Sequence, residues 1–343
     1  GEGMIRFNTD SGSLEYYRGT HWENIIVNNN DLGGGLNGIG TTASTQGTGT
    51  RAFFAGGYSG GNRNQIQFFT VATQGIAQDF GDLQSGKRSN AGAGGRTRAI
   101  WFGGTDGTRD TEIDQITVSS TGDATAFGSL NTATSNMGAT SNSTRSITVG
   151  GNQSPGVAIN EISYVATMSS GSEIDFGDLI GDKQNMGACA SSVRAIMGGG
   201  TPGPSHDDVI EYITISSTGN AQDFGNLTES KNDNVAFSNS TRGVFAGGLN
   251  PGRTNVIEFV QIATTGNAID FGDTTTGRQH SGGASSSTRG LVMGGSNPSS
   301  PFASFTSVDY IEILTTGNAS DFGDLAFGAW SGQNGCSNGH GGL

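Results

Sequence analysis

One pattern recurs six times between residues 51 and 325, and this repeat limits the possible folds more than any other feature of the sequence. Each copy contains an Arg that begins a run ending in Gly-Gly, a Gly in a predicted hairpin turn, and a Phe followed by Gly. The Arg residues are Arg51, Arg98, Arg145, Arg194, Arg242 and Arg289. The hairpin glycines are Gly75, Gly122, Gly171, Gly219, Gly266 and Gly317. The phenylalanines are Phe80, Phe127, Phe176, Phe224, Phe271 and Phe322. Repeats of this kind are typical of structural units that pack on one another.

The spacing of these markers separates framework from loop. The hairpin Gly and the Phe are 5 residues apart in every copy, and the Phe and the following Arg are 18 apart wherever both exist. The Arg and the hairpin Gly are 24, 24, 26, 25, 24 and 28 residues apart. This variable segment also holds the six prolines, Pro155, Pro202, Pro204, Pro251, Pro298 and Pro301. Because surface loops tolerate insertions and framework does not, the variable segment is predicted to contain an exposed loop.

Each copy is predicted to form four short strands. The first is rich in small residues, the second runs from the Arg to the Gly pair, the third is the most apolar, and the fourth leads to the Phe. A Thr-Gly or Ser-Gly hairpin signal lies between the third and fourth strands in most copies. We find no convincing amphipathic helix.

The third strand is apolar on both faces. Ile210 and Tyr212 share one face in the fourth copy, and Ile213 lies on the other. A sheet that is apolar on both faces is buried between other sheets. Four-stranded sheets packed face to face around an axis make a β-propeller, and small residues suit the crowded innermost strands. The sequence therefore predicts an all-β protein, a propeller of four-stranded antiparallel blades.

The repeat resembles the kelch family. The likeness lies in a strand that ends in Gly-Gly, a hydrophobic strand after it, and an aromatic residue in the fourth strand. The doublets are Gly56-Gly57, Gly103-Gly104, Gly150-Gly151, Gly198-Gly199, Gly247-Gly248 and Gly294-Gly295. The fourth strand departs from the family, because Phe stands where Trp is usual. The resemblance covers roughly residues 41–343 and implies a propeller, but propellers host many functions.

The two ends of the chain leave the number of blades open. Residues 1–28 are predicted to form three short strands outside the repeat, residues 29–40 a Gly-rich linker, and residues 41–50 the first strand of the first blade. Counting 18 residues from Phe322 reaches His340, so Gly335–His340 is a seventh first strand with no partners of its own. We expect a seventh blade made from both ends, which would leave no exposed sheet edge. The alternative is six blades plus an N-terminal attachment element.

The N-terminal segment also resembles a short module of tailed-bacteriophage structural proteins, especially fibre and appendage proteins of marine phages. The matching pieces are Ile5-Arg6-Phe7-Asn8-Thr9, Leu14-Glu15-Tyr16-Tyr17 and Gly19-Thr20-His21-Trp22. The resemblance covers under a tenth of the chain. It implies a virion setting, with residues 1–28 contacting other virion proteins.

Composition and charge argue against several classes of partner. The net charge is −13 with only 17 Lys and Arg, which opposes binding to nucleic acid or to anionic membranes. No apolar run is long enough to span a bilayer, so no membrane insertion is expected. Cys189 and Cys336 fall in first strands of different blades and are expected to be free thiols.

The predicted binding surface is the face that carries the loops between second and third strands. The crossings from one blade to the next lie on the same face, because successive connections of antiparallel strands alternate between the two ends of a blade. The candidate binding residues in the loops are Tyr58, Arg63, Asp106, Arg109, Pro155, His206, Arg253 and Phe302. Those in the crossings are Lys87, Lys183, Lys231 and Arg278, each seven residues after a Phe.

These basic crossing residues have two interpretations of equal weight. They form a partly basic ring that binds a ligand, or they pair with neighbouring carboxylates while the loops vary neutrally. Phe302, flanked by prolines, is a candidate apolar anchor.

No catalytic, metal or cofactor site is predicted. The recurring Asp-Phe-Gly could suggest a kinase metal site in isolation, but no other kinase element accompanies it. The four histidines lack metal-ligand spacing. Asp106 with Asp110 could hold calcium, although solvated loop carboxylates are the simpler interpretation.

The expected function is that of a non-enzymatic virion protein on a phage tail or capsid appendage, extracellular once the particle is released. It would recognise a host-surface glycan or protein, or serve as decoration, and an oligomer is possible. Two other classes stay open. One is a propeller enzyme acting on surface polysaccharide, which carboxylates clustered in an axial cleft would favour. The other is a cellular interaction scaffold of the kelch type.

Overall fold

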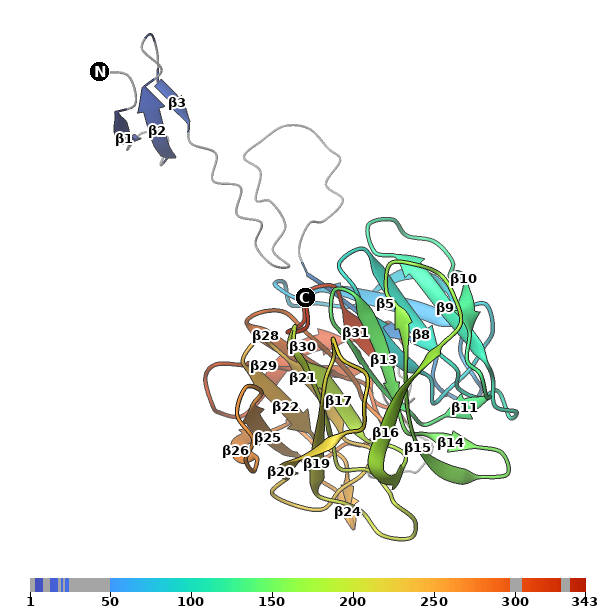
Figure 1. Ribbon diagram of the computed structural model, residues 1–343. Coiled ribbons are helices and arrows are strands. Elements are labelled where there is room, and N and C mark those ends of the chain that lie inside the picture. Colours follow the sequence, from blue (N-terminus) through green and yellow to red (C-terminus); the bar gives the residue numbers. More distant parts are fainter. Residues whose placement is uncertain are drawn as a thin grey trace.

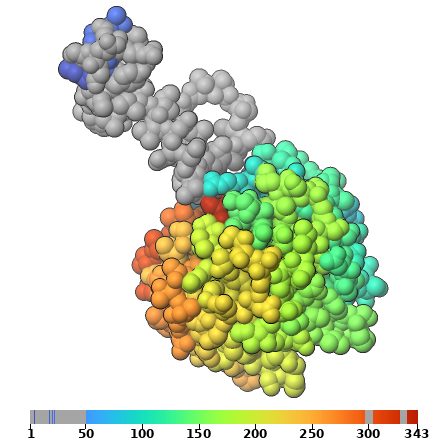
Figure 2. All heavy atoms as spheres, in the orientation of Figure 1, coloured from blue at the N-terminus to red at the C-terminus, as the bar shows by residue number. Residues whose placement is uncertain are grey.

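The computed structural model describes residues 4–8, 13–17, 20, 22–24, 50–296, 304–327 and 334–343. Six four-stranded antiparallel blades follow one another around an axis (Figure 1). Figure 2 shows the same view with all heavy atoms as spheres, and the colours pass in chain order across the surface of the propeller. The all-β propeller prediction is confirmed. The described residues contain no helix long and apolar enough to cross a membrane.

Each blade is built from consecutive strands, with one exception in the first. Blade 1 contains β31 (Gly335–Ser337), β4 (Arg51–Ala55), β5 (Gln65–Thr70) and β6 (Gln78–Asp82). Blade 2 contains β7 (Ala91–Gly94), β8 (Arg98–Phe102), β9 (Glu112–Thr117) and β10 (Thr125–Ser129). Blade 3 contains β12 (Gly138–Ser141), β13 (Arg145–Val149), β15 (Val157–Ala166) and β16 (Ile174–Lys183). Blade 4 contains β17 (Gly187–Ala190), β18 (Arg194–Gly198), β19 (Val209–Thr214) and β20 (Gln222–Asn226).

The last two blades follow the same order. Blade 5 contains β21 (Val235–Ser238), β22 (Arg242–Ala246), β25 (Val256–Gln261) and β26 (Ile269–Asp273). Blade 6 contains β27 (Gly282–Ser285), β28 (Arg289–Met293), β29 (Ser307–Glu312) and β30 (Ser320–Asp324). Short additional strands lie in the connections: β11 (Thr134–Ser135), β14 (Asn152–Gln153), β23 (Leu249–Asn250) and β24 (Gly252–Arg253).

The seven-blade expectation is wrong, and the six-blade alternative is correct. β31 pairs with β4, with Gly335 opposite Phe54 and Ser337 opposite Ala52, so it is the innermost strand of blade 1. Blade 6 then packs on blade 1 as the other neighbours pack. The hairpin Gly75 N–H donates to Phe322 O at 3.0 Å, as Gly122 N–H does to Phe80 O at 2.8 Å in the next seam. The prediction that residues 41–50 form the first strand of blade 1 is wrong, because β31 occupies that place. The linker at residues 29–40 lies outside the described residues.

The N-terminal strands form a sheet of their own. β1 (Ile5–Asn8), β2 (Ser13–Tyr17) and β3 (Trp22–Asn24) make a three-stranded sheet in that order, and they pair only with one another among the described strands. The rings of Tyr17 and Trp22 pack with centroids 5.3 Å apart. The described strands of this segment, β1–β3, therefore contribute to no blade, and β31 pairs with β4 instead.

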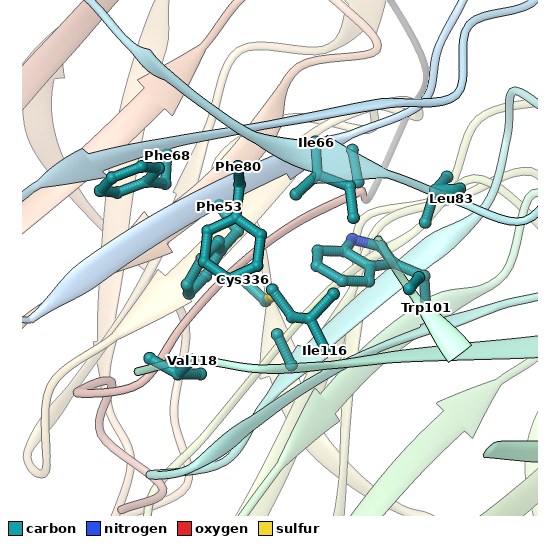
Figure 3. Packing of buried hydrophobic residues seen from close by; sticks show 12 residues of the cluster. Phe53, Ile66, Phe68, Phe80, Leu83, Trp101, Ile116, Val118 and Cys336 are labelled. Carbon is teal, nitrogen blue, oxygen red and sulfur yellow. The ribbon is translucent and has the colours of Figure 1, made fainter. Parts of the chain in front are cut away.

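The repeated Phe-Gly dipeptide fixes the contact between neighbouring blades. All six phenylalanines are buried, and most meet an aromatic ring of the third strand edge-on, as Phe224 meets Tyr212 at 5.9 Å. Figure 3 shows such a cluster, in which Phe53, Phe80 and Trp101 come from two blades. The residue after the Phe must be Gly, because the neighbouring blade leaves no room for a side chain. A Cβ on Gly272 would lie 2.5 Å from Gly317 O in the next blade, and φ at Gly272 is +144°.

The repeated Arg also joins neighbouring blades. Arg242 Cζ lies 4.4 Å from the ring centroid of Phe259 in its own blade, and its Nη1 donates to Ile313 O of the next blade at 2.9 Å. Arg51, Arg145, Arg194 and Arg289 repeat both contacts. A cation over an aromatic face contributes about 0.5–1 kcal/mol at such partly exposed sites.

The innermost strands nearly fill the axis. Ser141, Ser238, Ser285 and Ser337 each donate a side-chain hydrogen bond to a carbonyl of a neighbouring inner strand at 2.6–2.7 Å. Residues 338–343 lie across one end, where His340 Nε2 contacts Gly94 O at 2.7 Å. A space of about 40 Å³ remains along the axis. Cys189 and Cys336 are buried there as free thiols, as the sequence predicts.

Candidate binding face

The loops between second and third strands and the crossings between blades do lie together, and we call this surface the loop face. Isolated bridges join four of the described crossings to the following loop: Arg88 with Thr105, Gln184 with Thr201, Asn232 with Leu249, and Gln279 with Ser296. In blade 3, β14 pairs with both β11 and β15. Side chains connect successive loops as well. Arg253 Nε donates to Ser296 Oγ at 3.2 Å, and Arg109 Nη2 donates to Asn152 Oδ1. The loops are thus held by the scaffold.

The four basic crossing residues are not exposed on this face. Lys87, Lys183, Lys231 and Arg278 are between 0 and 5% exposed. Each pairs with a carboxylate on the third strand of the next blade: Lys87 with Asp114 at 2.7 Å, Lys183 with Glu211 at 2.6 Å, Lys231 with Glu258 at 2.5 Å, and Arg278 with Asp309 at 3.0 Å. The interpretation as an exposed basic ring does not fit this burial. The interpretation as ion pairs does.

The sequence also indicates these ion pairs, through the residue type at one position of the third strand. Eight residues before the hairpin Gly stand Gln67, Asp114, Ser163, Glu211, Glu258 and Asp309. An acid occurs there in the four blades that follow a basic crossing. Ser163 follows Thr134, and Gln67 follows Ala329. The residue seven after the Phe and the residue eight before the next hairpin Gly therefore change together from copy to copy, as expected for residues in contact.

At the loop-face end of the innermost strands lies a ring of polar residues in an unusual backbone conformation. Ser89, Asn136, Asn185, Asp233 and His280 stand nine residues after a Phe, and each has φ between +53° and +60°. Consecutive members are joined by their backbones, as where Asp233 N–H donates to Asn185 O at 2.8 Å. Left-handed backbone at residues other than Gly is uncommon and often marks functional sites. We call these five residues the axial ring.

The strongest electrostatic feature of the axial ring is the pair of Asp233 and His280. His280 Nε2 lies 3.1 Å from Asp233 Oδ1. Gln279 Nε2 lies 3.0 Å from His280 Nδ1, and donation there leaves the ring proton on Nε2, facing Asp233. Burial raises the pKa of Asp233, and the charges of His280, His206 and Arg253 oppose that shift. Two predicted residues, His206 and Arg253, are thus near the ring.

The other predicted binding residues in the described loops lie in the loops of blades 1, 2 and 3. Tyr58 packs under Arg88, whose Cζ lies 5.2 Å from its ring centroid, and Arg63 Nη2 donates to Ser59 O at 2.9 Å. Asp106 and Pro155 are exposed. Phe302 and the rest of its proline-flanked segment lie outside the described residues.

One hollow on the loop face has a substantial volume. A cavity of about 250 Å³ lies between blades 1 and 2 and is lined by Ser85, Lys87, Asp106, Thr108, Arg109, Asp110 and Glu112. Lys87 Nζ lies 3.5 Å from Asp110 and 3.2 Å from Glu112 at its inner end. Among the residues that the structure describes, no three His, Cys, Asp or Glu side chains are grouped to hold a metal ion.

The loop face therefore offers hydroxyl, amide, carboxylate and guanidinium groups on a rigid support. Such convergent polar groups suit recognition of a polar ligand through hydrogen bonds. A scan against protein-family models finds no match, and a search of curated proteins finds no significant relative.

Proposed function

We propose that the chain is a non-enzymatic virion structural protein: a kelch-like propeller on a phage tail or capsid appendage that binds a host-surface glycan or protein through its loop face. In this role residues 1–28 attach the propeller to other virion proteins. The phage-like N-terminal segment supports the setting, and its separate three-stranded sheet suits an attachment element.

The observation that carries the binding role is the difference between the two faces. The loop face carries the axial ring and the described loops of the one segment in which the copies differ in length and contain proline. The hairpin turns on the other face keep a constant spacing to the Phe, because the hairpin Gly and the residue two after it donate backbone hydrogen bonds to the preceding blade. Loops that are already ordered lose little entropy when they bind.

The described residues of the axial ring favour binding over polysaccharide hydrolysis. Hydrolysis of glycosidic bonds usually needs two carboxyl groups across the scissile bond. The ring presents one carboxylate, Asp233, and His280 already contacts it. A cellular scaffold would use the same face for a protein partner, so the identity of the bound partner separates these two roles.

A binding assay with matched variants tests the face. Label the full-length protein and measure its binding to a panel of marine bacteria and to an array of bacterial surface glycans. Tyr58→Ala, His206→Ala and Arg253→Ala together should weaken binding by at least about tenfold, the loss expected for anchor residues. Thr218→Ala with Thr265→Ala, on the exposed 3–4 turns, should leave binding unchanged.

The folding of every variant is checked by its melting temperature. Loss of binding only in the turn variant would refute the choice of face. An unmodified protein that binds no cell and no glycan in the panel would contradict host recognition.

A further inference from the structure

Three of the seams between blades contain the same polar arrangement, which we call the seam seat. A backbone N–H four residues after the Phe donates to the acidic side chain eight residues before the next hairpin Gly. Ile180 N–H donates to Glu211 at 2.8 Å, Thr228 N–H to Glu258 at 2.5 Å, and Thr275 N–H to Asp309 at 2.8 Å. The basic crossing residue then neutralises that carboxylate.

The seam between blades 2 and 3 keeps the carboxylate and lacks the base. Asn131 N–H, the equivalent donor, bonds Glu173 Oε1 at 2.8 Å. Glu173 comes from just before β16 and takes the place of the third-strand acid, which is Ser163 here. The basic position is Thr134. A cavity of about 10 Å³ lies in this seam and is lined by Thr134, Ser163, Glu161, Glu173 and other residues.

Other contacts of this seam are also missing. Arg98 has Gln115 where the other repeat arginines have an aromatic ring, and its Nη1 is buried without a hydrogen bond. In four copies an Asn or Asp after the hairpin Gly accepts from the preceding blade, as Asn220 Oδ1 accepts from Asp178 N–H at 3.1 Å, whereas Ser172 stands at this position here. On the loop face the seam is still joined by β11 and β14.

We propose that a proton on Glu173 takes the place of the missing base, so that the seam between blades 2 and 3 is a pH-sensitive contact within the propeller. Protonated Glu173 closes the seam, and ionised Glu173 weakens it. The residues that line the cavity contain one other titratable group, Glu161 of β15, and no positively charged side chain.

The titration of Glu173 falls in the physiological range. Burial raises its pKa to about 7, the bond from Asn131 opposes the shift, and the charge of Glu161 adds to it. The unfolded chain has a pKa near 4.5 at this residue. Between these values the folded state holds more protons than the unfolded state, so stability falls as pH rises through this window and levels off above about 7.

Three variants of the full chain test the proposal through melting temperatures from pH 5 to pH 8.5. Glu173→Gln keeps the acceptor for Asn131 and removes the charge. It should match the wild type at pH 5 and melt about 2–4 °C higher at pH 8.5. Thr134→Lys restores the repeat's own base and should show the same gain at pH 8.5. The matched control Glu211→Gln, in a seam that has its base, should lower the melting temperature at both pH values.

Hydrogen exchange gives a local measurement that does not depend on global melting. In the wild type, amides of residues 128–137, corrected for intrinsic rates, should lose protection between pH 6 and pH 8, and in Glu173→Gln they should not. A gain for Glu173→Gln that is equal at pH 5 and pH 8.5 would overturn the proposal. So would a calcium-induced rise in wild-type melting temperature at pH 8.5 that Glu173→Gln abolishes, because a metal ion would then neutralise the seam.

Discussion

Deletion of residues 333–343 will lower the melting temperature by on the order of 10 °C, and the whole propeller will lose stability together. The deletion removes β31 and leaves β4 as an open edge in blade 1. It also removes Asn334, which accepts from Trp101 Nε1 at 3.0 Å and donates to Ala55 O at 2.8 Å. With Ser337 Oγ and the ladder included, at least five hydrogen bonds are lost, each contributing about 1 kcal/mol.

Adding back the missing strand as a peptide provides a control for this deletion. A synthetic peptide of residues 331–343, added to the truncated protein, should restore most of the melting temperature by re-forming the pair with β4. Deletion of residues 341–343 alone, which keeps β31, should cost much less. A truncated protein that melts like the full chain would show that β31 does not close the ring.

Phe224→Ala should lower the free energy of unfolding by about 3–5 kcal/mol, as for other large-to-small changes in a core. Phe224 is 2% exposed and lies in the cluster that joins blades 4 and 5, with Leu227, Phe245 and Val260. Because both neighbouring sheets are rigid, they can close only partly around the cavity. Denaturant unfolding measures the loss.

The matched control is Ile269→Ala, on the fourth strand of blade 5. Ile269 is 61% exposed, so its removal should change the free energy by less than about 0.5 kcal/mol. Similar losses from both variants would contradict the role of the repeated Phe as the contact between blades.

The strands and the blade architecture could be predicted because the same sequence pattern recurs in each of the six copies. Gly272 and Phe271 have counterparts in every other copy, and the contacts they make are the same in every seam. Which strand completes blade 1 could not be predicted by counting. A propeller closes through hydrogen bonds between segments far apart in sequence, and β31 pairs with β4 across almost the whole chain.

The binding face could be predicted only in outline. For Lys231 the sequence analysis left both ligand binding and pairing with a carboxylate open, although the paired substitutions along the repeat already indicated the ion pair with Glu258. The axial ring had no comparable signal. Ser89, Asn185 and His280 share a backbone conformation and a position, not a side-chain chemistry.

The proposed virion role is tested most directly by a cryo-electron microscopy map of a particle in which this chain is found. We expect the strands β1–β3 to contact neighbouring virion proteins, and the loop face with Asp233 and His280 to point toward solvent and the host. A map in which the loop face is packed against the virion, with the short turns outermost, would contradict it.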